Sequence, residues 1–173
     1  MLVAQSCIVA DPPEYRDPGQ TRPLLDTYGA SPPTTRILVV DSAIKNPIQF
    51  NVPVQSEDVG EDLRAIFFLD YGSARQSKLL GRTIPASTYE NKTRAAELPW
   101  LPIVPMDVAP GCHFVTLVVA HESSFLSSND ERLDPTKAPD DASLLTWTVN
   151  IDPSPDAPNT LVNCPSSAVA GGS

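Results

Sequence analysis

Glycine, histidine and long apolar runs are all scarce in this 173-residue chain, and each scarcity excludes a class of function. The eight glycines are dispersed, so the sequence has no phosphate-binding loop and no Gly-x-Ser-x-Gly nucleophile elbow. The two histidines, His113 and His121, would lie about 26 Å apart on one strand, too far to ligate the same metal ion. No apolar run approaches the roughly 18 residues of a membrane-crossing helix.

Basic residues are also in short supply. Twelve Lys and Arg face 21 Asp and Glu, for a net charge of −9. Proteins that bind nucleic acid gather their cations, because neutralising phosphates supplies most of the affinity. Here the cations are scattered, and we expect the loose group between Arg75 and Arg94 to be a solvated face. We therefore expect no nucleic-acid partner, and we predict that the protein is not an enzyme.

Proline, by contrast, is abundant, with 19 residues. Proline fixes φ and removes a backbone donor, so a chain this rich in it cannot be mostly helical. Residues 8–35 contain six prolines and no periodic apolar pattern. We expect residues 1–35 to form a start segment and an extended tether, residues 36–152 a folded domain, and residues 153–173 a C-terminal tail.

The start of the chain carries the first of three cysteines, Cys7. Leu2-Val3-Ala4, a small residue at Ser6 and then Cys7 resemble the end of a lipoprotein signal peptide. The resemblance implies that Cys7 is lipidated and anchors the protein to a membrane. The chain departs from the usual pattern at Ala4, where a large aliphatic residue is expected, so the alternative of an N-terminal thiol stays open.

The domain itself has the pattern of a β-protein. Apolar residues alternate with polar ones between Ile48 and Gln55 and again between Leu145 and Ile151, as in strands with one buried face. The segments Ile37–Val40, Leu63–Tyr71 and Gly111–His121 are rich in β-branched and aromatic residues. Two further short strands are expected near Arg82–Ala86 and Leu101–Val108. Pro53 places the strand that contains it at a sheet edge or a bulge.

The last two of these strands resemble a known family. Pro110-Gly111-x-His113-x-Val115-Thr116-Leu117-Val118-Val119 is similar to the penultimate strand of immunoglobulin-like and polycystin-repeat-like domains, and residues 145–151 resemble their last strand. The resemblance implies an all-β, antiparallel sandwich of six to seven strands with extended N- and C-terminal tails. We expect Phe50, Val118 and Trp147 to meet between its two sheets.

The sandwich brings two cysteines within reach of each other. If the strands around residues 112–121 and 144–152 are antiparallel neighbours, Cys112 lies beside the end of the last strand, and Cys164 follows that end closely. We therefore predict a Cys112–Cys164 disulfide, with two separate thiols as the alternative. Closing a loop of roughly 50 residues stabilises a fold by about 4 kcal/mol in the chain-entropy model.

One connection, residues 122–143, is far longer than a hairpin requires. Its acids and amides offer hard oxygen ligands, so calcium at Asn129, Asp130 and Asp134 is an alternative to a solvated acidic loop. Its apolar residues Phe125, Leu126 and Leu133 must either fold back on the domain or contact a partner.

The two histidines are weaker candidates for a functional site. We expect His113 to be a hydrogen-bonded residue beside a turn, and His121 to form a surface pair with Glu122.

These features predict a non-catalytic module of the bacterial cell envelope, periplasmic or at the surface and lipid-anchored. It would bind a protein or glycan partner or act as a structural spacer, and it would need no cofactor. The alternative is a calcium-dependent or carbohydrate-binding accessory domain.

Overall fold

The computed structural model describes residues 20–41, 48–88, 91–98, 108–127, 132–133 and 136–152, and all structural statements concern these residues. This part is all-β apart from one short 3-10 turn, η1 (Glu122–Ser124), and one helical turn, α1 (Ala138–Asp141). None of its helical segments has the length and hydrophobicity to cross a membrane. Its strands are β1 (Leu24–Leu25), β2 (Leu38–Val40), β3 (Phe50–Gln55), β4 (Leu63–Leu69), β5 (Ser77–Ile84), β6 (Thr93–Leu98), β7 (Gly111–His121) and β8 (Ser143–Ile151).

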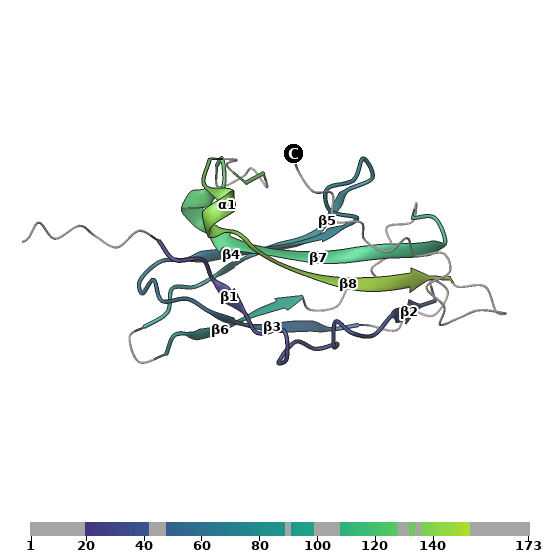
Figure 1. Ribbon diagram of the computed structural model, residues 1–173, viewed down its shortest axis with the longest axis horizontal. Helices are drawn as coiled ribbons and strands as arrows, with labels where there is room; N and C mark the ends of the chain where they lie inside the picture. Colours follow the sequence, from purple (N-terminus) through teal and green to yellow (C-terminus); the bar gives the residue numbers. More distant parts are fainter. Residues whose placement is uncertain are drawn as a thin grey trace, which may run out of the picture.

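The strands form two sheets that lie in layers (Figure 1). The smaller sheet has the order β1-β3-β6 and the larger one β2-β8-β7-β4-β5. β7 and β8 are antiparallel neighbours with Gly111 opposite Ile151, as the sequence predicted. The expectation of six to seven strands, all antiparallel, is wrong in two respects: eight strands occur in the described part, and β2 runs parallel to β8. The chain enters β2 from β1 in the smaller sheet, and no hairpin joins β2 to β8. No tight turn therefore forces these two strands to be antiparallel.

Aromatic side chains hold the two sheets together. The rings of Phe50 on β3 and Trp147 on β8 are 4.8 Å apart and nearly perpendicular, and Phe67 on β4 completes the group. All three are almost fully buried. Edge-to-face contacts of this kind add stability beyond the area they bury. The indole N–H of Trp147 donates to the carbonyl of Pro32 at 2.7 Å, which also ties the N-terminal segment to this core.

A second apolar cluster lies on the opposite face of the larger sheet. It contains Ile66 and Phe68 of β4, Val118 and Ala120 of β7, and Phe125 from the long connection. The expectation that Val118 lies between the sheets is therefore wrong. Residues alternate between faces along a strand, so Leu117 and Val119 point to the main core and Val118 points away from it.

The N-terminal segment is more structured than expected. Residues 20–35 were predicted to belong to the tether, but Leu24 and Leu25 pair with β3 and Ala30 is buried in the main core. Ser31 and Asn51 exchange two backbone hydrogen bonds, at 2.8 and 2.7 Å. The sequence of this segment has no periodic pattern of apolar residues, so no strand was predicted there. Backbone hydrogen bonds hold the segment in place, and they leave no such pattern. The structured domain therefore begins well before residue 36.

The strands around residues 77–98 also differ from the prediction. β5 begins five residues before the expected Arg82–Ala86 segment, and β6 occupies residues that were not expected to form a strand. Most of the other predicted strand, Leu101–Val108, lies outside the described residues.

Pro53 lies in β3, the middle strand of its sheet, rather than at an edge. The carbonyl of Pro53 accepts from the backbone N–H of Asp26, so the nitrogen of Pro53 points to the same side of β3. The short strand β1 has already ended at Leu25, so the missing N–H of Pro53 interrupts no β1–β3 ladder.

Candidate functional site

The strongest cluster of ionisable groups surrounds His121, the last residue of β7. This side chain is fully buried. Its Nδ1 lies 2.5 Å from Oδ1 of Asp141 in α1, and its backbone N–H donates to Oδ2 of the same carboxylate at 2.9 Å. The expectation of a surface pair between His121 and Glu122 is therefore wrong. The long connection after β7 returns over the strand end and brings Asp141 onto the ring.

A second carboxylate faces the other side of the ring. Oδ2 of Asp58, in the β3–β4 connection, lies 3.3 Å from Nε2 of His121. The contact is an ion pair without the geometry of a directed hydrogen bond. The same oxygen accepts from the backbone N–H and the hydroxyl of Thr21, at 2.8 and 2.9 Å. One buried ring thus joins the N-terminal segment, the β3–β4 connection and the long connection.

The electrostatics favour the charged forms of this pair. Burial acts to lower the pKa of His121, but the hydrogen bond that its ring donates to Asp141 and the charges of Asp141, Asp58 and Glu61 raise it overall. Burial acts to raise the pKa of Asp141, but its contacts with His121 lower it overall. The ring of His121 is fully buried and lies between two carboxylates, so it holds segments of the domain together. It offers no nitrogen to a substrate.

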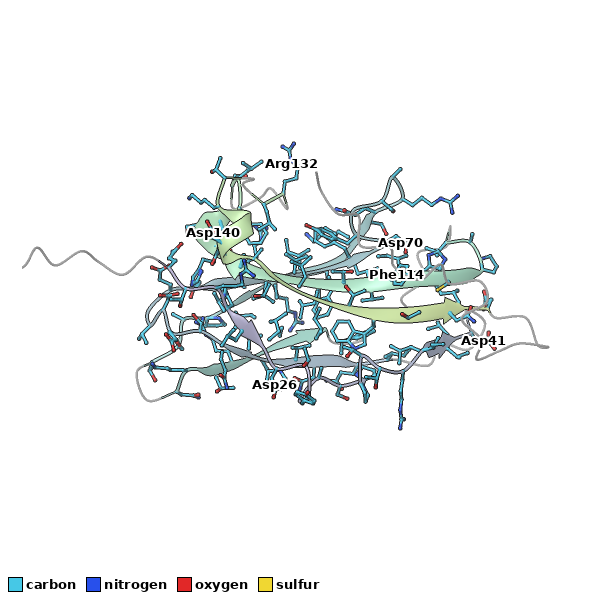
Figure 2. All side chains as sticks on the ribbon, viewed as in Figure 1. Asp26, Asp41, Asp70, Phe114, Arg132 and Asp140 are labelled. Atoms are coloured by element: carbon cyan, nitrogen blue, oxygen red, sulfur yellow. The ribbon has the colours of Figure 1, made fainter. Side chains whose placement is uncertain are left out.

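His113, near the start of β7, forms a second hydrogen-bonded cluster. Its Nδ1 contacts Oδ2 of Asp70 at 2.7 Å and its Nε2 contacts the carbonyl of Ala109 at 2.8 Å. Asp70 is placed beside Phe114 (Figure 2), whose N–H donates to Oδ1 at 3.0 Å and whose carbonyl accepts from the Asp70 N–H at 2.7 Å. His113 is thus the hydrogen-bonded, turn-adjacent residue that the sequence predicted.

Asp70 has a left-handed backbone, with φ of 52°, which ends β4 and turns its side chain back. Aspartate tolerates this conformation better than most residues do.

The long connection folds back on the domain. Phe125 is 5% exposed, contacts the guanidinium of Arg64 at 5.0 Å and forms an isolated bridge with Leu133. Leu133 packs against the same cluster. Of the two alternatives, Phe125 and Leu133 therefore fold back on the domain and serve internal packing, and they do not form a partner-binding surface. Leu126 is 49% exposed, and its contact with a partner stays a prediction.

The remaining predicted site residues lie outside the described residues. These are the lipidation site Cys7, the disulfide partner Cys164 and the calcium ligands Asn129, Asp130 and Asp134. The lipid anchor, the Cys112–Cys164 bond and the metal site therefore stay predictions. In the part that is described, no three His, Cys, Asp or Glu side chains are grouped as metal ligands.

Sequence reasoning missed Asp58 and Asp141 as partners of His121, and Thr21 as a partner of Asp58. Asp141 lies 20 residues after His121, and Thr21 pairs with Asp58 across 37 residues. No local spacing signals contacts of this range. The sequence did mark Asp141 as one of several acids in the connection, but the presence of hard oxygens alone does not separate an ion-pair partner from a metal ligand.

Comparison with known proteins adds little to what the geometry of these clusters shows. No protein-family model matches the chain, and no curated protein matches it. One similar solved structure is AggA, the major subunit of aggregative adherence fimbriae type I from Escherichia coli, with 13% identity, 76% of this chain and 97% of that chain covered, and a TM-score of 0.42. Another is the alkylpurine DNA glycosylase AlkC of Pseudomonas fluorescens bound to abasic-site DNA, with 16% identity, 70% and 28% coverage, and a TM-score of 0.33. The chain spans little more than a quarter of AlkC, and both likenesses are too weak to support an argument about function.

Proposed function

We propose that this protein is a non-catalytic, immunoglobulin-like module of the bacterial cell envelope that binds a protein partner and requires no cofactor. The observation that carries this proposal is that neither histidine ring presents a free nitrogen at the surface. His121 is fully buried between two carboxylates, and both ring nitrogens of His113 contact oxygens of the domain itself. General acid–base catalysis needs a group within hydrogen-bond reach of a substrate, and neither ring offers a nitrogen for it.

The strand order supports the immunoglobulin-like part of the proposal. Immunoglobulin-like sandwiches place their first, second, fourth and fifth strands in one sheet and their third, sixth and seventh in the other. If β1 and β2 are counted as a first strand shared between the sheets, the order β1-β3-β6 and β2-β8-β7-β4-β5 fits that scheme, with β5 as an additional strand beside the third and no counterpart of the fourth among the described residues. The buried tryptophan lies on the last strand, β8, rather than on the third.

The envelope location rests on Cys7 and the residues before it, which resemble the end of a lipoprotein signal peptide except at Ala4. Cell fractionation and palmitate labelling of the natural protein test it. We expect label in the membrane fraction from the wild-type chain and none from Cys7→Ser, with Cys112→Ser as a labelled control. Recovery of an unlabelled wild-type protein in the cytosol would overturn the proposed location.

A test of the non-catalytic assignment uses the same histidines. Under the proposal, substitutions of His113 or His121 change stability, and binding of a partner changes only in proportion to the unfolded fraction. A hydrolytic or transferase activity that His113→Gln abolishes in a fully folded protein would show that the cluster is catalytic.

A further inference from the structure

β5 is the edge strand of the larger sheet among the described residues. In the part of the chain that the structure describes, β5 pairs with β4 and with no other strand. Its outer N–H and C=O groups therefore form a row that another extended chain can pair with. Edge strands of this kind are one of the recurring sites at which proteins bind extended peptides.

Two pockets open at the two ends of this strand. One, of about 280 Å³, lies between Arg75, Ser77 and His113, and the other, of about 190 Å³, lies between Arg82, Ile84 and Ala95. Both pockets are on the side of the sheet that faces the main core, because Ser77 pairs with Leu69 and Arg82 with Ala65, and both partners belong to that core. Residues directly opposite each other on antiparallel strands point to the same face.

Each pocket contains one exposed arginine. Arg75 lies in the first and Arg82 in the second, on a protein whose net charge is −9. Asp70 also lines the first pocket, and its carboxylate keeps its negative charge although its two oxygens accept from His113 and Phe114. The residues that line the second pocket include no acid. The second pocket thus presents a cation with no acid beside it, and the first presents Arg75 together with the carboxylate of Asp70.

We propose that the β5 edge binds an extended, acidic segment of a partner protein by strand addition. Side chains of an added strand point alternately to the two faces of the sheet, and those on the core side would enter the two pockets. Acidic residues about four to six positions apart would reach Arg75 and Arg82. This proposal rests on the proposed role as a protein-binding module and names the chemistry of the partner.

A second copy of this chain fits the edge poorly. Antiparallel pairing of two β5 strands would bring Arg75, Lys78 and Arg82 of one copy near the same cations of the other. Like charges across a strand pair are destabilising. Charge complementarity therefore favours an acidic partner strand over self-association.

Fluorescence polarisation with the full-length protein tests the proposal. The probe is a labelled nine-residue peptide of Thr and Val with two Glu on one face, four residues apart. The matched peptide carries Lys at both positions. We expect the Glu peptide to bind, and Arg75→Ala and Arg82→Ala each to weaken binding about fivefold, the value of one exposed charge pair. Arg36→Ala, an exposed arginine before β2, is the control and should change nothing.

Two peptides that are N-methylated at alternate residues identify the mode of binding. Methyl groups along one edge of the peptide block pairing with β5, and those along the other edge do not, so one pattern should abolish binding and the other should leave it. Equal binding of both methylated peptides, or of the Lys peptide, overturns the proposal. The proposal is also overturned if sedimentation shows a dimer whose association becomes stronger in Arg82→Glu, because the β5 edge would then pair with a second copy of the chain. No peptide binding by a protein that is correctly located in the envelope overturns the edge site alone, whereas a cytosolic protein overturns the proposed function.

Discussion

Nδ1 of His121 lies 2.5 Å from Oδ1 of Asp141, and this contact joins the end of β7 to the helical turn that precedes β8. Asp58 faces the opposite nitrogen. The ring and Asp141 are buried, so water cannot replace the carboxylate of Asp141 without a rearrangement of the end of the sandwich. Three segments that the strand ladder does not connect are held at one point.

Removal of one partner should therefore destabilise the domain strongly. We expect Asp141→Asn to lower the free energy of unfolding by about 3 kcal/mol, because it leaves a buried imidazole without its main partner. Urea unfolding followed by the fluorescence of the buried Trp147 measures this change. Asp140→Asn, at an exposed neighbour in the same turn, should change the stability by less than about 0.5 kcal/mol. Equal effects of the two substitutions would contradict the role of Asp141.

The same pair makes stability depend on pH. The pKa of His121 is raised above its ordinary 6.5, so its contribution is complete below about pH 6.5 and is lost as the pH rises through the folded-state value. The pKa of Asp141 is lowered below 3.8, so its contribution is complete above about pH 3.8 and is lost as the pH falls through the folded-state value. The pair should contribute most between these limits.

The stability difference between wild type and His121→Gln isolates this contribution, because other titrating groups cancel. We expect the difference to be largest between about pH 4 and pH 6.5 and to shrink toward alkaline pH. Urea midpoints at several pH values give the curve. A stability difference that grows as the pH rises above 7 would mean that His121 is neutral in the folded state.

Phe125 should matter to stability more than its place in a loop implies. Phe125→Ala removes a buried ring from the cluster that covers the outer face of β4 and β7, and we expect a loss of about 3 kcal/mol. Leu126→Ala, at the half-exposed neighbour, should cost less than about 0.5 kcal/mol. Thermal unfolding of both variants compares them. If Leu126→Ala is the more destabilising, the connection packs in another way.

The predicted Cys112–Cys164 bond can be tested with the folded, unreduced protein. We expect a thiol reagent to modify neither cysteine before reduction and both after it. Cys164→Ser should lower the stability of the oxidised protein by about 4 kcal/mol and leave the stability of the reduced protein unchanged. Stoichiometric labelling of both thiols without reduction would exclude the bond.

Local pattern was enough for the central strands. β7 and β8 combine β-branched residues with turn signals at their ends, and both were predicted nearly to the residue. β5 and β6 were predicted poorly, because an edge strand such as Ser77–Ile84 is half-exposed along its length and shows no clean alternation. The β1 segment gave no signal, because two paired residues are too few for a period.

By itself, the sequence determined the all-β class, the antiparallel β7–β8 pair and the burial of residues such as Phe50 and Trp147, since these follow from side-chain alternation within one strand. Only the tertiary structure decided that Val118 faces a second cluster, that Phe125 is internal and that His121 lies between Asp141 and Asp58. The second face of β7 is buried because the long connection between β7 and β8 folds back over it. An ion pair across 20 residues depends on folded geometry, which the spacing of residues in the chain does not contain.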